Sequence, residues 1–240
     1  MKCLRISLVV LLLVAPMVTH AEQEKIVRVY GPGGPHRALS ECADLFEQKS
    51  DVEISIIKAL PHQLERKVRV DGDIYYGGAE YMLDQFHDKN PDVLDMSTFE
   101  KLHPRRIGIL VRKGNPLQLE QVQDLQKGVV VLDVKLENMR HLNGLDDGMA
   151  TSFHRFAYTG RQGADIWLSD QDVDAWVTYK SWYYVLRDKS DFVEIPGEGS
   201  ARYTPLALTN HTENPREARA FIDFLKTEEA RQVFERHGWY

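Results

Sequence analysis

VYGPGGPHRAL, residues 29–39, joins an apolar strand to a helical pattern through a turn made of glycine and proline. The strand is predicted over residues 26–30, and the helical pattern begins at His36 and Arg37. Glycine lets the backbone approach a ligand closely, and a helix N-terminus presents free N–H groups and a partial positive charge. The stretch therefore predicts either an ordinary strand-to-helix turn or a turn that binds an anion.

A second junction of the same kind lies at residues 76–80, where YGGAE ends a short strand predicted over residues 73–76. In α/β proteins, ligands bind beyond the carboxyl ends of the strands. If the two strands are neighbours, both turns face one cleft, which favours a binding site. Glu80 either caps the start of its own helix or accepts a hydrogen bond from a hydroxyl or ammonium group of a ligand.

Strand and helix patterns alternate along the whole chain. The predicted strands cover residues 26–30, 52–57, 73–76, 107–111, 129–132 and 203–209, and helical stripes lie at 60–68, 82–86 and 218–225. Asn214 and Pro215 start the last helical pattern, which has Phe234 further on and Gly238 as a stop. Such alternation predicts α/β layers with mainly parallel strands.

Residues 1–21 have the pattern of a secretory signal peptide, with an apolar run that is too short to span a membrane. The chain contains 30 Lys and Arg and 36 Asp and Glu, and the signal peptide holds Lys2 and Arg5 but no acid. The mature chain therefore has 28 basic and 36 acidic residues, a net charge of −8. An acidic exported chain is a poor candidate for nucleic-acid binding, so any anion site requires a local concentration of donors.

Catalytic and metal-binding patterns are missing from the sequence. There is no G-x-S-x-G, no H-E-x-x-H and no paired cysteine, and the histidines lack the short spacing of metal ligands. Cys42, the only cysteine after cleavage, shares a helical face with apolar residues and is predicted to be a core residue. We therefore expect no enzyme, no metal site and no cofactor.

Six side chains could bring positive charge to an anion site, namely His36, Arg37, Arg105, Arg106, Lys180 and Arg202. Most Lys and Arg are simply solvated. Arg105 and Arg106 gain weight because they immediately precede a strand. Lys180 lies within the aromatic cluster at residues 176–184, which predicts a pocket wall, a part of the core or a dimer surface.

The order of these motifs resembles the type II periplasmic solute-binding proteins of the molybdate and sulfate kind. More narrowly, VYGPGGPHRAL, DIYYGGAEYML, ILVRKGNP and DAWVTYKSWY resemble the accessory colonization factor AcfC family. The resemblance covers nearly the whole mature chain, and the C-terminal NPREARAFIDFLKTEEARQVFERHGW fits the wider group.

That resemblance implies an α/β fold of two lobes, each a mainly parallel sheet flanked by helices. Two crossing strands would join the lobes, near residues 106–111 and 203–209. The first lobe would comprise residues 22–109 and 204–240, and the second lobe residues 110–203. The ligand would lie in the cleft between the lobes, and binding would close them about a hinge.

The resemblance also implies a small anionic ligand, either an oxyanion or a phosphorylated or carboxylic metabolite, and no enzymatic activity. A membrane permease would be the partner of such a protein, and a homodimer is an open alternative. The ligand contacts that it implies are Gly33, Gly34, Pro35, His36, Gly78, Ala79, Glu80, Arg105, Lys180 and Arg202.

The predicted second lobe departs from the family pattern. Residues 141–155 read HLNGLDDGMATSFHR, with Asp146 and Asp147 where the family has a turn rich in Ser, Thr and Gly. Lys180 stands where Asn is expected and could neutralise ligand charge. The predicted function is a periplasmic solute-binding protein for a small anion. The alternative is an exported accessory protein for adhesion, colonization or chemotaxis on a transporter-like fold.

Overall fold

The computed structural model describes residues 25–133 and 154–240 of the chain. The predicted signal peptide, residues 1–21, lies outside these ranges, as do Asp146 and Asp147. Among the residues described, no helix is long and apolar enough to cross a membrane.

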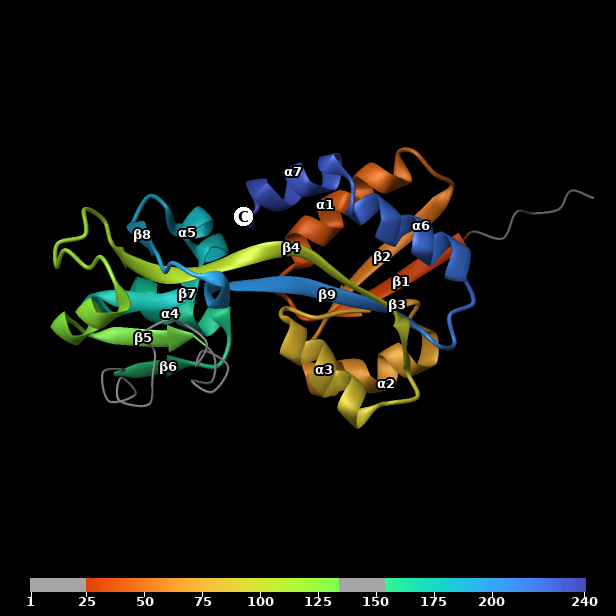
Figure 1. The fold of residues 1–240 in the computed structure, drawn as a ribbon, viewed down its shortest axis with the longest axis horizontal. Helices are drawn as coiled ribbons and strands as arrows, with labels where there is room; N and C mark the ends of the chain where they lie inside the picture. Colours follow the sequence, from red (N-terminus) through yellow and green to blue (C-terminus); the bar gives the residue numbers. More distant parts are fainter. Residues whose placement is uncertain (1–24, 134–153) are drawn as a thin grey trace, which may run out of the picture.

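Two α/β lobes lie end to end, and two long strands run from one to the other (Figure 1). The described strands are β1 (Lys25–Gly31), β2 (Val52–Lys58), β3 (Ile74–Tyr76), β4 (Leu94–Arg112), β5 (Val130–Asp133), β6 (Arg155–Ala157), β7 (Ala175–Tyr179), β8 (Ser190–Glu194) and β9 (Ala201–Thr209). The described helices are α1 (His36–Glu47), α2 (Pro61–Asp71), α3 (Glu80–Lys89), α4 (Gly160–Ser169), α5 (Lys180–Leu186), α6 (Pro215–Leu225) and α7 (Glu228–Arg236), with short 3₁₀ turns η1 (Val122–Lys127) and η4 (Glu198–Ser200).

Parallel pairing organises both lobes, as the alternating pattern predicts. β1 lies between β2 and β3 and is parallel to both, and β5 lies between β6 and β7 and is parallel to both. The sheet order is β2-β1-β3-β9-β4-β7-β5-β6, and β8 also pairs with β4. Because β1 and β3 are parallel neighbours, the two glycine-containing turns that follow them lie at the same edge of the sheet.

The strands β4 and β9 connect the two lobes and pair with each other in antiparallel register. They contain the segments predicted as crossings, residues 106–111 and 203–209, but β4 begins much earlier, at Leu94. Its pairing with β9 shifts register twice before Pro104, and these irregularities interrupt the alternation by which a strand is predicted. The lobe boundaries at residues 109–110 and 203–204 stay a prediction.

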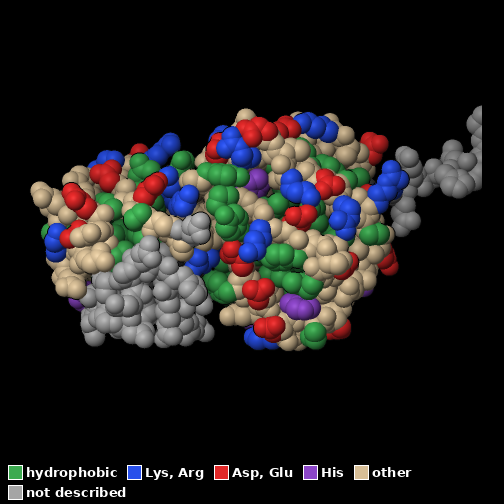
Figure 2. All heavy atoms as spheres, in the orientation of Figure 1, with side chains coloured by type: hydrophobic (Ala, Val, Ile, Leu, Met, Phe, Trp, Pro, Cys, Tyr) green, Lys and Arg blue, Asp and Glu red, His purple; other side chains and the backbone are tan. Residues whose placement is uncertain are grey.

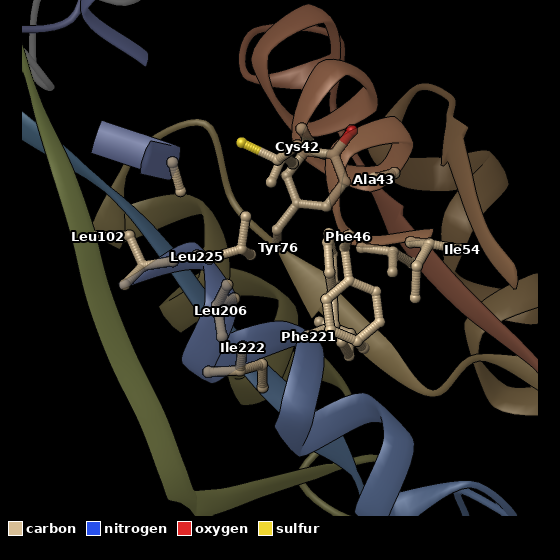
Figure 3. Close-up of a cluster of buried hydrophobic side chains, with 14 of the residues drawn as sticks. Cys42, Ala43, Phe46, Ile54, Tyr76, Leu102, Leu206, Phe221, Ile222 and Leu225 are labelled. Atoms are coloured by element: carbon tan, nitrogen blue, oxygen red, sulfur yellow. The ribbon is translucent and has the colours of Figure 1, made fainter. Parts of the chain in front are cut away.

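Helices cover both faces of the sheet formed by β1, β2, β3 and β9. On one face α1, α6 and α7 pack together, and the rings of Phe46 and Phe221 meet edge to face with centroids 5.4 Å apart. The helices α2 and α3 cover the other face. Cys42 lies on the buried face of α1 (Figure 3), as predicted, and burial raises the pKa of its thiol to about 12. At neutral pH this thiol is therefore protonated and unreactive.

The aromatic cluster at residues 176–184 belongs partly to the core of the other lobe. The side chains of Trp176 and Tyr179 are buried, Trp182 and Tyr183 are half-buried, and Tyr184 is 38% exposed. Trp176 packs against α4 and lies with its ring centroid 5.6 Å from that of Trp182. Of the three interpretations of this cluster, a place in the core therefore fits Trp176 and Tyr179.

Candidate functional site

The first turn exposes backbone at the start of α1. Gly33 and Gly34 are exposed, and a Cβ atom on Gly33 would meet nothing within 4 Å. The first intrahelical bond runs from the N–H of Leu39 to the carbonyl of Pro35. The backbone N–H groups that precede Leu39 in the first turn of α1 therefore have no acceptor within the helix, which makes this end suitable for an anion.

The second turn is fastened to the connecting strands at three points. The N–H of Gly77 donates to the carbonyl of Pro205 at 2.8 Å, and the carbonyl of Gly78 accepts from Nη2 of Arg105 at 2.7 Å. The backbone N–H of Tyr203 donates to Oε2 of Glu80 at 3.1 Å. These bonds hold the start of α3 against β4 and β9, at the point where those strands leave the first sheet.

Arg105 is the predicted contact that the structure places most clearly between these two turns. Its side chain is buried, with 7% exposure, and its Nη1 lies 2.9 Å from the position that a Cβ atom on Gly34 would occupy. Its Cζ atom lies 3.5 Å from the ring centroid of Tyr179 and 5.2 Å from that of Trp239. Two aromatic rings and one backbone carbonyl therefore surround the guanidinium group.

The charge of Arg105 is incompletely balanced by the residues that the structure describes. No carboxylate lies within 4 Å of it in the described ranges, and its Nε is buried without a hydrogen-bond partner there. Aromatic faces offset part of the cost of burying a cation, but a buried charge without a counter-charge is unfavourable. An anion at this position would provide both the missing charge and the missing acceptor.

Arg202 lies directly opposite Arg105 in the antiparallel pair of β4 and β9. Its Nη1 donates to the carbonyls of Gly199 and Ala201, at 2.9 and 2.8 Å. The structure thus brings two of the predicted cations onto adjacent strands at the junction of the lobes.

Lys180 has a different surrounding. Its ammonium group forms an ion pair with Glu194 at 2.6 Å, and this hydrogen bond lowers the pKa of the Glu194 carboxyl, with a smaller contribution from Arg106. Glu194 is the last residue of β8 and lies opposite Gly108 of β4. Its carboxylate therefore interacts with the positive charges of both Lys180 and Arg106. A ligand contact through Lys180 stays a prediction, and it would compete with Glu194.

His36 stands at the first position of α1. Burial lowers the pKa of its imidazole, and the charges of Lys58 and Arg37 lower it further. Its Nδ1 atom is buried and has no hydrogen-bond partner in the described part of the chain. A neutral ring at this position can both donate and accept a hydrogen bond.

Sequence reasoning missed the contribution of Trp239. This side chain is buried, donates from Nε1 to Oγ1 of Thr204 at 3.2 Å, and flanks Arg105 from the C-terminal end of the chain. The sequence does show a Gly-Trp pair after the last helix, but this pair does not predict which residue the Trp239 ring will contact. Within residues 25–133 and 154–240, no group of three or more His, Cys, Asp or Glu is placed to hold a metal ion.

Two lobes joined by paired strands, with two glycine turns and a buried arginine at the junction, define the class of two-lobed binding proteins. Residues 27–240 match the family model described as bacterial extracellular solute-binding protein, and the chain belongs to this family. A search of curated proteins found no match.

Solved structures share the fold. PEB3 bound to L-phospholactate has a TM-score of 0.74 and 24% identity, with 89% of this chain and 98% of that chain covered. A structure of Peb3 from Campylobacter jejuni has a TM-score of 0.73 at the same identity and coverage. The sulfate-binding protein SubI from Mycobacterium tuberculosis H37Rv has a TM-score of 0.71 and 15% identity, with 90% and 86% covered. The chain therefore has the two-lobed α/β fold of periplasmic binding proteins. The family is described as solute-binding, and SubI as sulfate-binding.

Proposed function

We propose that this protein is a periplasmic solute-binding protein that captures a small anion between its two lobes. The observation that carries the proposal is Arg105, a buried guanidinium that lacks a neighbouring carboxylate among the residues described. An anion placed against Arg105 would also meet the start of α1 at Gly34 and the Gly78 turn. The lobes would close about β4 and β9 when the ligand binds.

The ligand class that fits this site is an oxyanion or a phosphorylated or carboxylic metabolite. One structural neighbour was solved with L-phospholactate, and another is a sulfate-binding protein. Both neighbours support an anionic ligand for this site. The narrower relationship to the AcfC family is part of this proposal.

The contacts would come from the two turns and the connecting strands. Gly33, Gly34, Pro35 and His36 would form one side, and Gly78, Ala79 and Glu80 the other. Arg105 would balance the ligand charge at short range, with Arg202 next to it. Lys180 would contribute only after release from Glu194.

The partner of such a protein would be a membrane permease of the ABC transporter type. On the face shown in Figure 2, basic and acidic side chains of the described residues are interspersed and form no basic patch of the kind that binds nucleic acid. The homodimer and the accessory role in adhesion, colonization or chemotaxis stay predictions, since no described feature favours them over solute binding.

A ligand screen by thermal unfolding and titration calorimetry tests the proposal. Sulfate, molybdate, phosphate, phosphoglycerate and citrate would each be added at increasing concentration. A ligand at 100 times its Kd adds about 2.7 kcal/mol to the free energy of unfolding. We expect Arg105→Met to remove most of this stabilisation and Arg106→Met, which removes an exposed charge from the next residue, to retain it.

The proposal is wrong if no anion stabilises the protein, or if Arg105→Met binds as tightly as the wild type. The melting temperature of each variant without ligand shows whether it is folded.

A further inference from the structure

We propose that Glu80 makes this site selective for anions that also carry an O–H group, such as hydrogen phosphate or a hydroxy acid. This inference rests on the proposed function and concerns which small anions the same site accepts. It follows from the position of the Glu80 carboxylate relative to β3, β9 and Arg105.

The carboxylate lies beyond the carboxyl end of β3, where ligands bind in an α/β sheet. Tyr76, the last residue of β3, pairs with Leu206 of the antiparallel strand β9. Tyr203 comes three residues earlier in β9 and therefore lies past the end of β3. Glu80 reaches this point, because its Oε2 accepts the backbone N–H of Tyr203.

The same turn connects Glu80 to Arg105. The carbonyl of Gly78, two residues before Glu80, accepts from Nη2 of Arg105. Tyr203 pairs with Pro104 in β4, and Pro104 directly precedes Arg105. The carboxylate and the guanidinium are thus held by neighbouring points of one turn and one strand pair, so a ligand at Arg105 approaches Glu80.

Only one oxygen of Glu80 is occupied in the described part of the protein. Oε2 accepts from Tyr203, and Oε1 has no hydrogen-bond partner there. An ionised carboxylate accepts hydrogen bonds and cannot donate them. A fully ionised oxyanion at Arg105 would therefore face a second acceptor of the same charge, whereas an O–H group on the ligand would donate to Oε1.

Two pairs of small probes test this on the wild-type protein. Phosphate, which carries a proton at neutral pH, is compared with sulfate, which does not. Lactate, which carries a hydroxyl group, is compared with propionate, which does not. The first pair identifies a protonated oxyanion as the ligand chemistry and the second a hydroxy acid. We expect the O–H member to bind at least about tenfold more tightly in one pair, because an acceptor that a bound ligand removes from water without offering a donor is costly.

Glu80→Gln is the decisive variant, because its amide can donate to an ionised oxygen. We expect it to reduce the discrimination to about threefold or less, chiefly by improving the binding of the probe without O–H. Asp84→Asn is the matched control, since Asp84 is an exposed carboxylate one turn further along α3. It should leave the discrimination unchanged.

The inference is overturned if the wild type binds sulfate and propionate at least as tightly as their O–H counterparts. It is also overturned if folded Glu80→Gln keeps the wild-type ratio. The wild-type comparison decides the matter even if Glu80→Gln does not fold. Anion binding that depends on Arg105 but is indifferent to Glu80 would reject this inference and leave the proposed function intact, whereas no anion binding would reject the proposed function itself.

Discussion

Arg105 of β4 and Arg202 of β9 lie directly opposite each other in the antiparallel pair that connects the lobes. Directly opposite residues project from the same face of a sheet, with Cβ atoms about 5 Å apart, and like charges there are unfavourable. Arg202 donates to the carbonyls of Gly199 and Ala201, whereas Arg105 donates to that of Gly78 and is buried. This arrangement concentrates positive charge at the junction of the lobes, where we propose that the anion binds.

A double-mutant cycle on these two residues tests whether both charges act on one ligand. We expect Arg105→Met to weaken anion binding by about 100-fold and Arg202→Met by about tenfold. The affinity of the double variant should fall by less than the product of the two factors, because the second charge has less effect once the ligand is poorly held. Titration calorimetry on the wild type and the three variants gives the coupling. Losses that multiply would show that the two charges act on the ligand independently, and an unchanged affinity of Arg202→Met would place Arg202 outside the site.

Gly34→Ala should weaken ligand binding through Arg105. A Cβ atom on Gly34 would lie 2.9 Å from Nη1 of Arg105, so the guanidinium must shift. We expect about a tenfold loss of affinity, because a displaced charge-assisted contact costs about 1–2 kcal/mol. The control is the same substitution in the Arg105→Met background, where Gly34→Ala should cause no further loss because the guanidinium is absent. A further tenfold loss in that background would contradict the contact between Gly34 and Arg105.

His103 should make stability depend on pH. It is buried in the irregular part of β4, where Nε2 lies 2.8 Å from the carbonyl of Leu225 and Nδ1 lies 2.7 Å from the Tyr240 hydroxyl. Burial lowers the pKa of its imidazole below the ordinary 6.5. The unfolded chain therefore binds a proton at a higher pH than the folded protein does, and stability falls as pH decreases below about 6.5.

Urea unfolding at several pH values between about 7.5 and 5 measures this effect. His103→Gln should reduce the loss of stability on acidification, by up to about 1.4 kcal/mol per pH unit in the affected range. His36→Gln should have an effect of the same sign, because burial lowers the pKa of His36 too. A pH dependence that is unchanged in both variants would assign it to other groups.

Gly238→Ala should disturb the contact between the C-terminal turn and α5. Gly238 has a φ of +84°, and a Cβ atom there would lie 2.7 Å from Cα of Ser181. We expect the free energy of unfolding to fall by roughly 3 kcal/mol, from backbone strain and steric overlap together. Gly114→Ala separates the two causes, because Gly114 has a φ of +82° and open space around it. It should lose only about 1 kcal/mol, and equal losses in chemical denaturation would contradict the contact.

Local sequence patterns determined where chain segments change direction. Glycines after two apolar strands predicted the turns before α1 and α3, and Asn214 with Pro215 predicted the start of α6. They did not predict that the C-terminal pattern divides into two helices. Thr227 begins α7 by accepting a hydrogen bond from the N–H of Ala230, and the buried positions Ala230, Val233 and Phe234 do not continue the helical spacing of those in α6.

The sequence by itself determined the α/β class, the two turns and the residues that could carry charge, because these depend on local conformation and residue chemistry. Only the tertiary structure decided which charges are neutralised. Lys180 meets Glu194 of β8, whereas Arg105 lies between Tyr179 and Trp239 without a nearby carboxylate among the described residues. Such neighbours come from distant parts of the chain and are fixed by strand register and helix packing, which a local pattern does not contain.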